Sequence, residues 1–178
     1  PAVVLVFLDT LMLVTTLVFA VRYWPSLVPQ FRRIGFDRWE AWAGIAILVP
    51  MLALNNVWHD FLRGLAGVEG ESFIDTLRNA GVSEGALMLS IAVFPAITEE
   101  IAFRGLLQHW LLVAVRASTA LVLTAALFAA IHFSIVSFPY LFALGLILGW
   151  MRWRTGSLWP PMAVHFLHNV AVLAWIGD

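Results

Sequence analysis

The sequence predicts an all-α fold, a polytopic transmembrane helix bundle of about six spans. Apolar residues make up 62% of the 178 residues and charged residues 12%, whereas a soluble domain has roughly 45–50% and 25%. The apolar residues also gather in six stretches, each close to the ~20 residues that a helix needs to cross a bilayer. The chain has no cysteine, which excludes disulfides, thiolate metal sites and a cysteine nucleophile. A net charge of -1 without a basic segment gives no sign of a nucleic-acid partner.

The six expected spans are separated by short polar connections. They cover about residues 1–21, 39–58, 85–110, 118–133, 138–153 and 158–176. Each stretch is too long and too evenly apolar for a core strand, so we expect helices. Pro50 and Pro95 should kink their helices, and Gly145 and Gly149 allow close helix packing. All nine tryptophans lie near the ends of these spans, as an aromatic belt at the lipid headgroups requires.

An acidic, glycine-rich stretch, residues 64–85, separates the second and third spans. Within it, residues 72–81 resemble a short capped helix whose apolar face would lie on the membrane surface. We therefore divide one integral membrane domain into two parts. Residues 1–80 form an N-terminal two-span region with an acidic interfacial loop, and residues 81–178 form a four-helix core.

The positively charged residues suggest an orientation in the membrane. All ten are arginines, and seven lie in or beside the first, third and fifth connections: Arg22, Arg32, Arg33, Arg38, Arg116, Arg152 and Arg154. Connections rich in arginine stay on the cytoplasmic side of a membrane. We therefore expect these three connections in the cytoplasm and both termini outside.

Three ionisable side chains lie close together in the third expected span: Glu99, Glu100 and Arg104. An ionisable group at the centre of a span costs roughly 2.5–3.5 kcal/mol on insertion, so each needs a partner or a function. Neighbours on a helix point about 100° apart, whereas residues four apart share a face. We expect Glu100 to pair with Arg104, and Glu99, which has no partner at helical spacing, to act as a general base or acid. A structural ion pair with a spare carboxylate is the alternative.

Two later spans contain polar side chains that could take part in catalysis. His132 follows the fourth apolar stretch, and in the sixth span His165 and Asn169 are four apart and share a face. Interhelical hydrogen bonding is the alternative for that pair. His168 is offset from both, and we interpret His59 and His109 as interfacial residues near span ends. The expected limits put His132 near the outer end of its span and His165 about 10 Å from the cytoplasmic end of its own. Either the fourth span begins later or tilts, or the bundle lets water reach inward.

One carboxylate, two histidines and one amide on three helices suit two kinds of chemistry. They suit water activation with stabilisation of an oxyanion. They also suit a zinc site with Glu99, His132 and His165 as ligands and an open position for water. The sequence contains no His-Glu-x-x-His motif, no Gly-x-Ser-x-Gly motif and no aspartate pair within spans, so three other protease mechanisms have little support.

Around these residues the chain resembles the CPBP family, the CAAX-protease and bacteriocin-processing intramembrane endopeptidases. Three family motifs occur in order. Glu-Glu-x-x-x-Arg is formed by Glu99, Glu100 and Arg104. Phe-x-x-x-His is formed by Phe128 and His132, and His-x-x-x-Asn by His165 and Asn169. The resemblance covers about residues 87–170, roughly half of the chain, and makes residues 81–178 a CPBP-like catalytic core.

The resemblance implies hydrolysis of a peptide bond in a membrane-anchored peptide or protein substrate, such as a prenylated CAAX tail, a leader peptide or a sorting tail. Glu99 and His132 would activate water, and His165 and Asn169 would stabilise the oxyanion. Glu100, Arg104 and Phe128 would support them. We expect no cofactor, with zinc as the alternative, although a neutral amide such as Asn169 is a poor zinc ligand.

The resemblance also bears on location and partners. We expect a multi-pass protein of a bacterial or archaeal cytoplasmic membrane, with membrane lipid and a larger membrane complex among its partners and no nucleic acid. The alternative function is a non-catalytic, CPBP-like scaffold subunit of such a complex, whose histidines bind a pigment or a metal.

Overall fold

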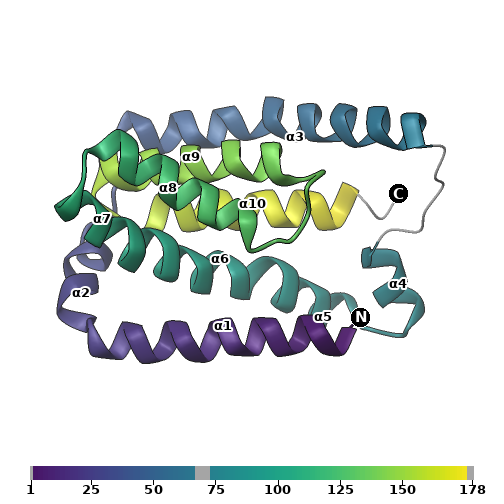
Figure 1. Cartoon of the computed structure of the whole chain (residues 1–178), viewed down its shortest axis with the longest axis horizontal. Coiled ribbons are helices and arrows are strands. Elements are labelled where there is room, and N and C mark those ends of the chain that lie inside the picture. The colour runs from purple at the N-terminus through teal and green to yellow at the C-terminus, as the bar shows by residue number, and fades with distance from the viewer. Residues whose placement is uncertain (1, 67–72, 176–178) are drawn as a thin grey trace.

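The computed structural model describes residues 2–66 and 73–175, which form a bundle of helices without a strand in those ranges (Figure 1). The helices are α1 (Ala2–Arg22), α2 (Trp24–Arg32), α3 (Trp39–Ala66), α4 (Phe73–Asn79), α5 (Glu84–Leu87), η1 (Met88–Val93), α6 (Phe94–Glu99), η2 (Glu100–Leu107), α7 (Gln108–Ala114), α8 (Ala117–Ala130), α9 (Phe138–Thr155) and α10 (Trp159–Trp175). The prediction of an all-α membrane helix bundle is confirmed.

The lengths of the helices bear on how the chain crosses the membrane. Within the described residues, Trp39–Leu62 and Glu84–Ala114 are long and apolar enough to span a bilayer, and α1 with α2 counts as a third if that bent pair is one span. α8 is a shorter apolar helix. Each predicted span corresponds to a helix or a continuous run of helices. The total of six crossings stays a prediction.

The first connection differs from the expected loop, because it contains helix α2. α2 is bent by 91° from α1. Pro25 lies in the first turn of α2, where the missing proline N–H has no helical partner to lose. Leu27 is fully buried, and the Gln30 side chain donates a 3.0 Å hydrogen bond to the Gly105 carbonyl. α2 therefore lies across one end of the bundle and packs against it.

The helical run Glu84–Ala114 changes its winding twice. η1 and η2 are π-helical and flank the short α6. Pro95, where we expect a kink, lies in the first turn of α6 and has no N–H to offer the carbonyl of Ile91, four residues earlier. π-Helical turns of this kind occur often at functional sites, because they change which side chains face a given side.

Close packing holds α9 against α8 and against the run that contains η2 and α7. A Cβ atom on Gly145 would lie 3.0 Å from the Cα atom of Ala125 on α8, so glycine is needed for this approach. On its other side, α9 accepts two hydrogen bonds at its glycine carbonyls. Arg104 Nη2 donates to Gly145 O at 3.3 Å and Gln108 Nε2 donates to Gly149 O at 2.8 Å. The predicted role of both glycines in helix packing is confirmed.

Replacement of Gly145 by valine is expected to lower the free energy of unfolding by about 1–3 kcal/mol, the usual cost of overpacking a tight contact. The added methyl groups would meet Ala125 and the Phe128 ring. Thermal unfolding in detergent micelles measures the effect. Gly85→Val is the matched control, because a Cβ atom at Gly85 meets nothing within 4 Å. Equal unfolding temperatures for the two variants would contradict the packing role.

The two ends of the bundle differ in charge. Figure 1 shows α2, the α7–α8 turn and the α9–α10 turn at one end, and the chain's N-terminus and α4 at the other. The seven arginines of the first, third and fifth connections therefore share one end, as the predicted orientation requires. Which end faces the cytoplasm stays a prediction.

At the end of the bundle where α4 lies, Ile74 of α4 is buried with Leu87 and Leu173. The acidic residues at 69 and 71, the expected cap Ser72 and Ile176 lie outside the described residues.

Candidate active site

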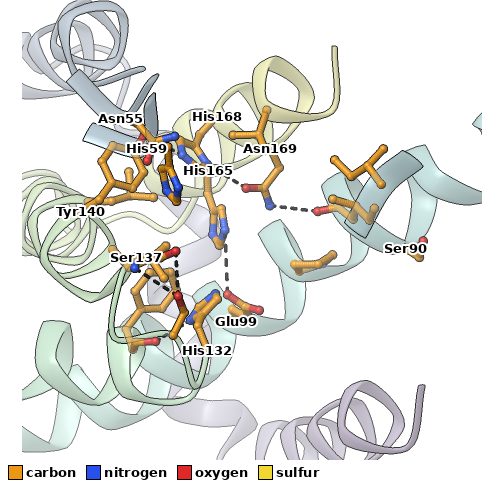
Figure 2. Close-up of a pocket in the computed structure, with 18 residues that line it drawn as sticks. Asn55, His59, Ser90, Glu99, His132, Ser137, Tyr140, His165, His168 and Asn169 are labelled. Atoms are coloured by element: carbon orange, nitrogen blue, oxygen red, sulfur yellow. Dashed lines mark hydrogen bonds and ion pairs between the residues drawn. The ribbon is translucent and has the colours of Figure 1, made fainter. Parts of the chain in front are cut away.

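A polar cavity of about 570 Å³ lies among α3, η1, α6, the α8–α9 turn, α9 and α10. The four residues that the sequence analysis assigned to catalysis, Glu99, His132, His165 and Asn169, all line it (Figure 2). They come from α6, from the turn after α8, and from α10. The fold thus brings together residues that lie up to 70 positions apart, 99 to 169.

Glu99 ends α6 and turns its carboxyl into the cavity. Its Oε2 atom is buried and has no hydrogen-bond partner among the described residues. The nearest basic atom recorded for it is Nε2 of His165, at 3.9 Å. This distance exceeds a direct hydrogen bond, yet one water molecule can contact both atoms. Glu99 is therefore a cavity-lining carboxylate with an oxygen atom that no described group hydrogen-bonds.

Glu100, one residue later, has a different environment. Its Oε1 atom accepts a hydrogen bond from Arg104 Nη1 at 2.8 Å and another from His165 Nδ1 at 2.9 Å. The Glu100 and Arg104 side chains are both 0% exposed. The pair expected from their spacing therefore forms, and it joins η2 to α10. Buried charges of this kind persist only when they are paired and hydrogen-bonded.

The position of one ring hydrogen of His165 can be assigned from its hydrogen-bond partner, Glu100. An ionised carboxylate only accepts hydrogen bonds, so Nδ1 of His165 carries a hydrogen directed at Glu100. Nε2 then faces the Glu99 carboxylate. The Nε2 and Oε2 atoms are 3.9 Å apart, a separation that one water molecule can bridge.

His132 is oriented by the end of its own helix. Its Nδ1 atom lies 2.8 Å from the Phe128 carbonyl oxygen, which only accepts, so the neutral ring carries its hydrogen on Nδ1 and exposes an Nε2 lone pair. The Phe128 ring packs against His132 at 5.0 Å and against His165 at 5.7 Å between centroids. It also lies 4.3 Å from the Arg104 guanidinium carbon. The Phe128 ring therefore packs against both histidines and provides an apolar contact for each.

The short α8 resolves the expected mismatch in depth between His132 and His165. α8 has 14 residues and ends at Ala130, three residues before the predicted limit of its span. Its length of about 21 Å is well below the ~30 Å of a hydrocarbon core. Figure 1 shows the α8–α9 connection stopping short of the ends of α3. His132 therefore lies in a turn that reaches the cavity.

Several polar residues that line the cavity were not assigned to the site from the sequence, among them Asn55, Ser90, Ser134 and Ser137. His168, treated as an offset neighbour, and His59, treated as interfacial, both line the cavity, as does Tyr140. The spacing of four between Asn55 and His59, both in the cavity wall, is a signal that could have identified α3 as part of the site. Tyr140 stands alone in its helix and carries no such signal. His109 is not among the residues that line the cavity.

The structure also bears on the zinc alternative, which needs Glu99, His132 and His165 as ligands. Among the described residues, no group of three or more histidine, aspartate and glutamate side chains is arranged to hold a metal ion. In the described geometry these side chains do not form a zinc ligand set.

Comparison with known proteins gives one match. The family model described as type II CAAX prenyl endopeptidase Rce1-like matches residues 82–171, which is half of the 178 residues. No curated protein and no solved structure shows a significant match to the chain. The matched range runs from just before α5 into α10 and includes every residue of the three motifs. The resemblance to CAAX proteases is therefore confirmed, and the chain belongs to the Rce1-like family of type II CAAX prenyl endopeptidases, a family of proteases.

Proposed function

We propose that this protein is an intramembrane endopeptidase that uses Glu99 and a water molecule to hydrolyse a peptide bond near the membrane surface. The substrate is a lipidated or membrane-anchored tail or leader peptide, and a prenylated CAAX tail is the first candidate because of the family's name. The observation that carries the proposal is the Glu99 carboxyl, whose buried Oε2 atom has no hydrogen-bond partner among the described residues and lies beside His165 in the cavity. The Oε2 atoms of Glu100 and Glu40 also lack a partner, but an arginine holds each of those carboxylates through Oε1.

The first step of the proposed reaction is attack by water. The water gives one proton to Glu99 and directs its other hydrogen to Nε2 of His132, while its oxygen bonds to the carbonyl carbon of the scissile peptide. The carbonyl oxygen becomes an oxyanion, which accepts hydrogen bonds from His165 Nε2–H and an Asn169 Nδ2–H. Glu99 then returns its proton to the amide nitrogen as the C–N bond breaks, which releases a carboxylic acid and an amine.

Glu100 and Arg104 support this chemistry by fixing the orientation of the His165 ring. The hydrogen bond from His165 Nδ1 to Glu100 turns Nε2 towards Glu99, where a hydrogen on Nε2 can be donated to the oxyanion. The ion pair with Arg104 holds the Glu100 carboxylate in place. In this proposal His165 and Asn169 are the two donors of the oxyanion site.

The test is a cleavage assay with the purified protein in lipid vesicles. One substrate is a farnesylated peptide that ends in Cys-aliphatic-aliphatic-X, and the other is the same peptide without the lipid. We expect mass spectrometry to find the lipidated peptide cut on the carboxyl side of its modified cysteine, with no cut by the Glu99→Gln variant. Cleavage of neither peptide, nor of a membrane-anchored leader peptide tested alongside, would contradict the proposed function.

Metal removal is expected to leave the activity unchanged. Because the reaction as proposed uses carboxylate, imidazole and amide groups alone, incubation with a chelator should change kcat by less than about twofold. Elemental analysis of the same preparation should find far less than one zinc per chain. Stoichiometric zinc, with activity lost on its removal and regained on its return, would overturn this prediction in favour of a metalloprotease.

A further inference from the structure

A series of hydrogen bonds links three helices in the wall of the cavity. The Tyr140 hydroxyl on α9 lies 2.7 Å from Nε2 of His168 on α10. Nδ1 of His168 lies 2.8 Å from Oδ1 of Asn169, and Nδ2 of Asn169 donates to the Ile91 carbonyl on η1 at 3.0 Å. The Tyr140 and His168 side chains are buried, and their rings also stack with centroids 5.6 Å apart. Neither residue belongs to the three family motifs.

The donor and acceptor of each hydrogen bond in this series can be assigned from its last group, the carbonyl of Ile91. A main-chain carbonyl only accepts, so the Asn169 amide must point its NH₂ group at Ile91 and its oxygen at His168. His168 must then carry its hydrogen on Nδ1, which leaves Nε2 as an acceptor. The Tyr140 hydroxyl is therefore the donor at the other end. One backbone oxygen thus sets the amide orientation, the histidine tautomer and the hydroxyl direction.

The Ile91 carbonyl can receive Asn169 because of the local helix geometry. Pro95 stands four residues after Ile91 and has no N–H to donate to it. Ile91 lies in the π-helix η1 and Pro95 in α6, and without a proline N–H the α-helical partner of the Ile91 oxygen is missing. The feature that disturbs the helix before Glu99 therefore also supplies the acceptor that holds Asn169.

We propose that Tyr140 and His168 are positioning residues that hold the Asn169 amide with its second Nδ2 hydrogen directed into the cavity. The Asn169 side chain is half-buried and lines that cavity, so this hydrogen is available to the oxyanion. If the amide rotated by half a turn, it would present its oxygen to the developing negative charge and oppose it. The inference rests on the proposed function, because it assumes that Asn169 is an oxyanion donor.

Three variants at the two positions separate positioning from packing. His168→Leu places an apolar side chain of similar size there and removes the donor to Asn169, and it is expected to lower kcat by about 10- to 100-fold with KM unchanged. His168→Asn places an amide N–H where Nδ1 stood and is expected to restore kcat to within about threefold. Tyr140→Phe keeps the stacked ring and removes one hydroxyl, so its expected loss is about three- to tenfold.

A double-mutant cycle with Asn169→Ala tests whether His168 acts through Asn169. Once the amide is gone, His168→Leu should lower kcat no further, because the group that it positions is absent. If His168→Leu has the same effect with and without Asn169, or if His168→Asn is as poor as His168→Leu, the positioning role is wrong while the proposed function stands. If the wild-type protein cleaves no peptide in the same assay, both are overturned.

Discussion

Replacement of Glu99 by glutamine is expected to lower kcat by about 10²- to 10⁴-fold while the protein still folds, because general-base catalysis contributes about that much. Glutamine keeps the size and shape of the side chain but cannot take a proton from water. The Oε2 atom of Glu99 has no hydrogen-bond partner among the described residues, so the substitution breaks no bond there. Peptide cleavage in vesicles measures the rate, and thermal unfolding confirms the fold.

The matched control is Glu84→Gln, at the start of the same helical run. The Glu84 side chain is 68% exposed and pairs with Arg78 at the surface. Surface ion pairs contribute little to stability, and Glu84 does not line the cavity, so kcat should change by less than about twofold. A Glu99→Gln variant that retains near-normal turnover would show that another group activates the water.

Replacement of Glu100 by glutamine is expected to lower the free energy of unfolding by about 3–5 kcal/mol, as the loss of one partner of a buried ion pair does. The Arg104 guanidinium would remain fully buried without a counter-charge. Activity should fall as well, because Glu100 also holds Nδ1 of His165. The two neighbouring acids should therefore differ, with Glu99→Gln affecting only activity and Glu100→Gln affecting both. Thermal unfolding and peptide cleavage of the two variants measure this difference.

Two further variants check the reason for that loss of stability. In the double variant Glu100→Gln/Arg104→Met both charges are gone, and stability should recover in part although activity should not. Glu40→Gln breaks a second ion pair, to Arg154, whose side chain is 46% exposed. Water can solvate that arginine, so the cost should be about 1 kcal/mol or less. If the Glu100 and Glu40 variants are destabilised equally, burial of the Glu100–Arg104 pair is not the cause.

Hydropathy predicted the helices well and their ends less well. The end of α8 at Ala130 carries no glycine or proline in the sequence, and the chain leaves the helix through Phe133 at a φ of +51°, a conformation that non-glycine residues rarely adopt. The predicted span therefore ran on to 133. α2 was not predicted. Pro25 lies in its first turn, where proline is well tolerated, but Pro29 lies inside the helix, where proline usually breaks one.

The spacing of residues along one helix predicted part of the site. Glu100 and Arg104 are four apart, and their pairing follows from helix geometry alone. Tyr140 and His168 meet only because α9 and α10 pack together, and no pattern within either helix indicates that contact. The π-helical winding on both sides of α6 also has no sequence signal except Pro95. Contacts between helices therefore set the limit of what the sequence could predict.

The most direct test of the central claim is a single-turnover hydrolysis in water labelled with oxygen-18, with enzyme in excess over the lipidated peptide. If Glu99 acts as a base on water, every product molecule carries one labelled oxygen in its new carboxyl group, and the Glu99 side chain carries none. If Glu99 instead attacks the peptide and forms an acyl intermediate, water can cleave that intermediate at the glutamate. Label in Glu99, with unlabelled product in the first turnover, would contradict the account.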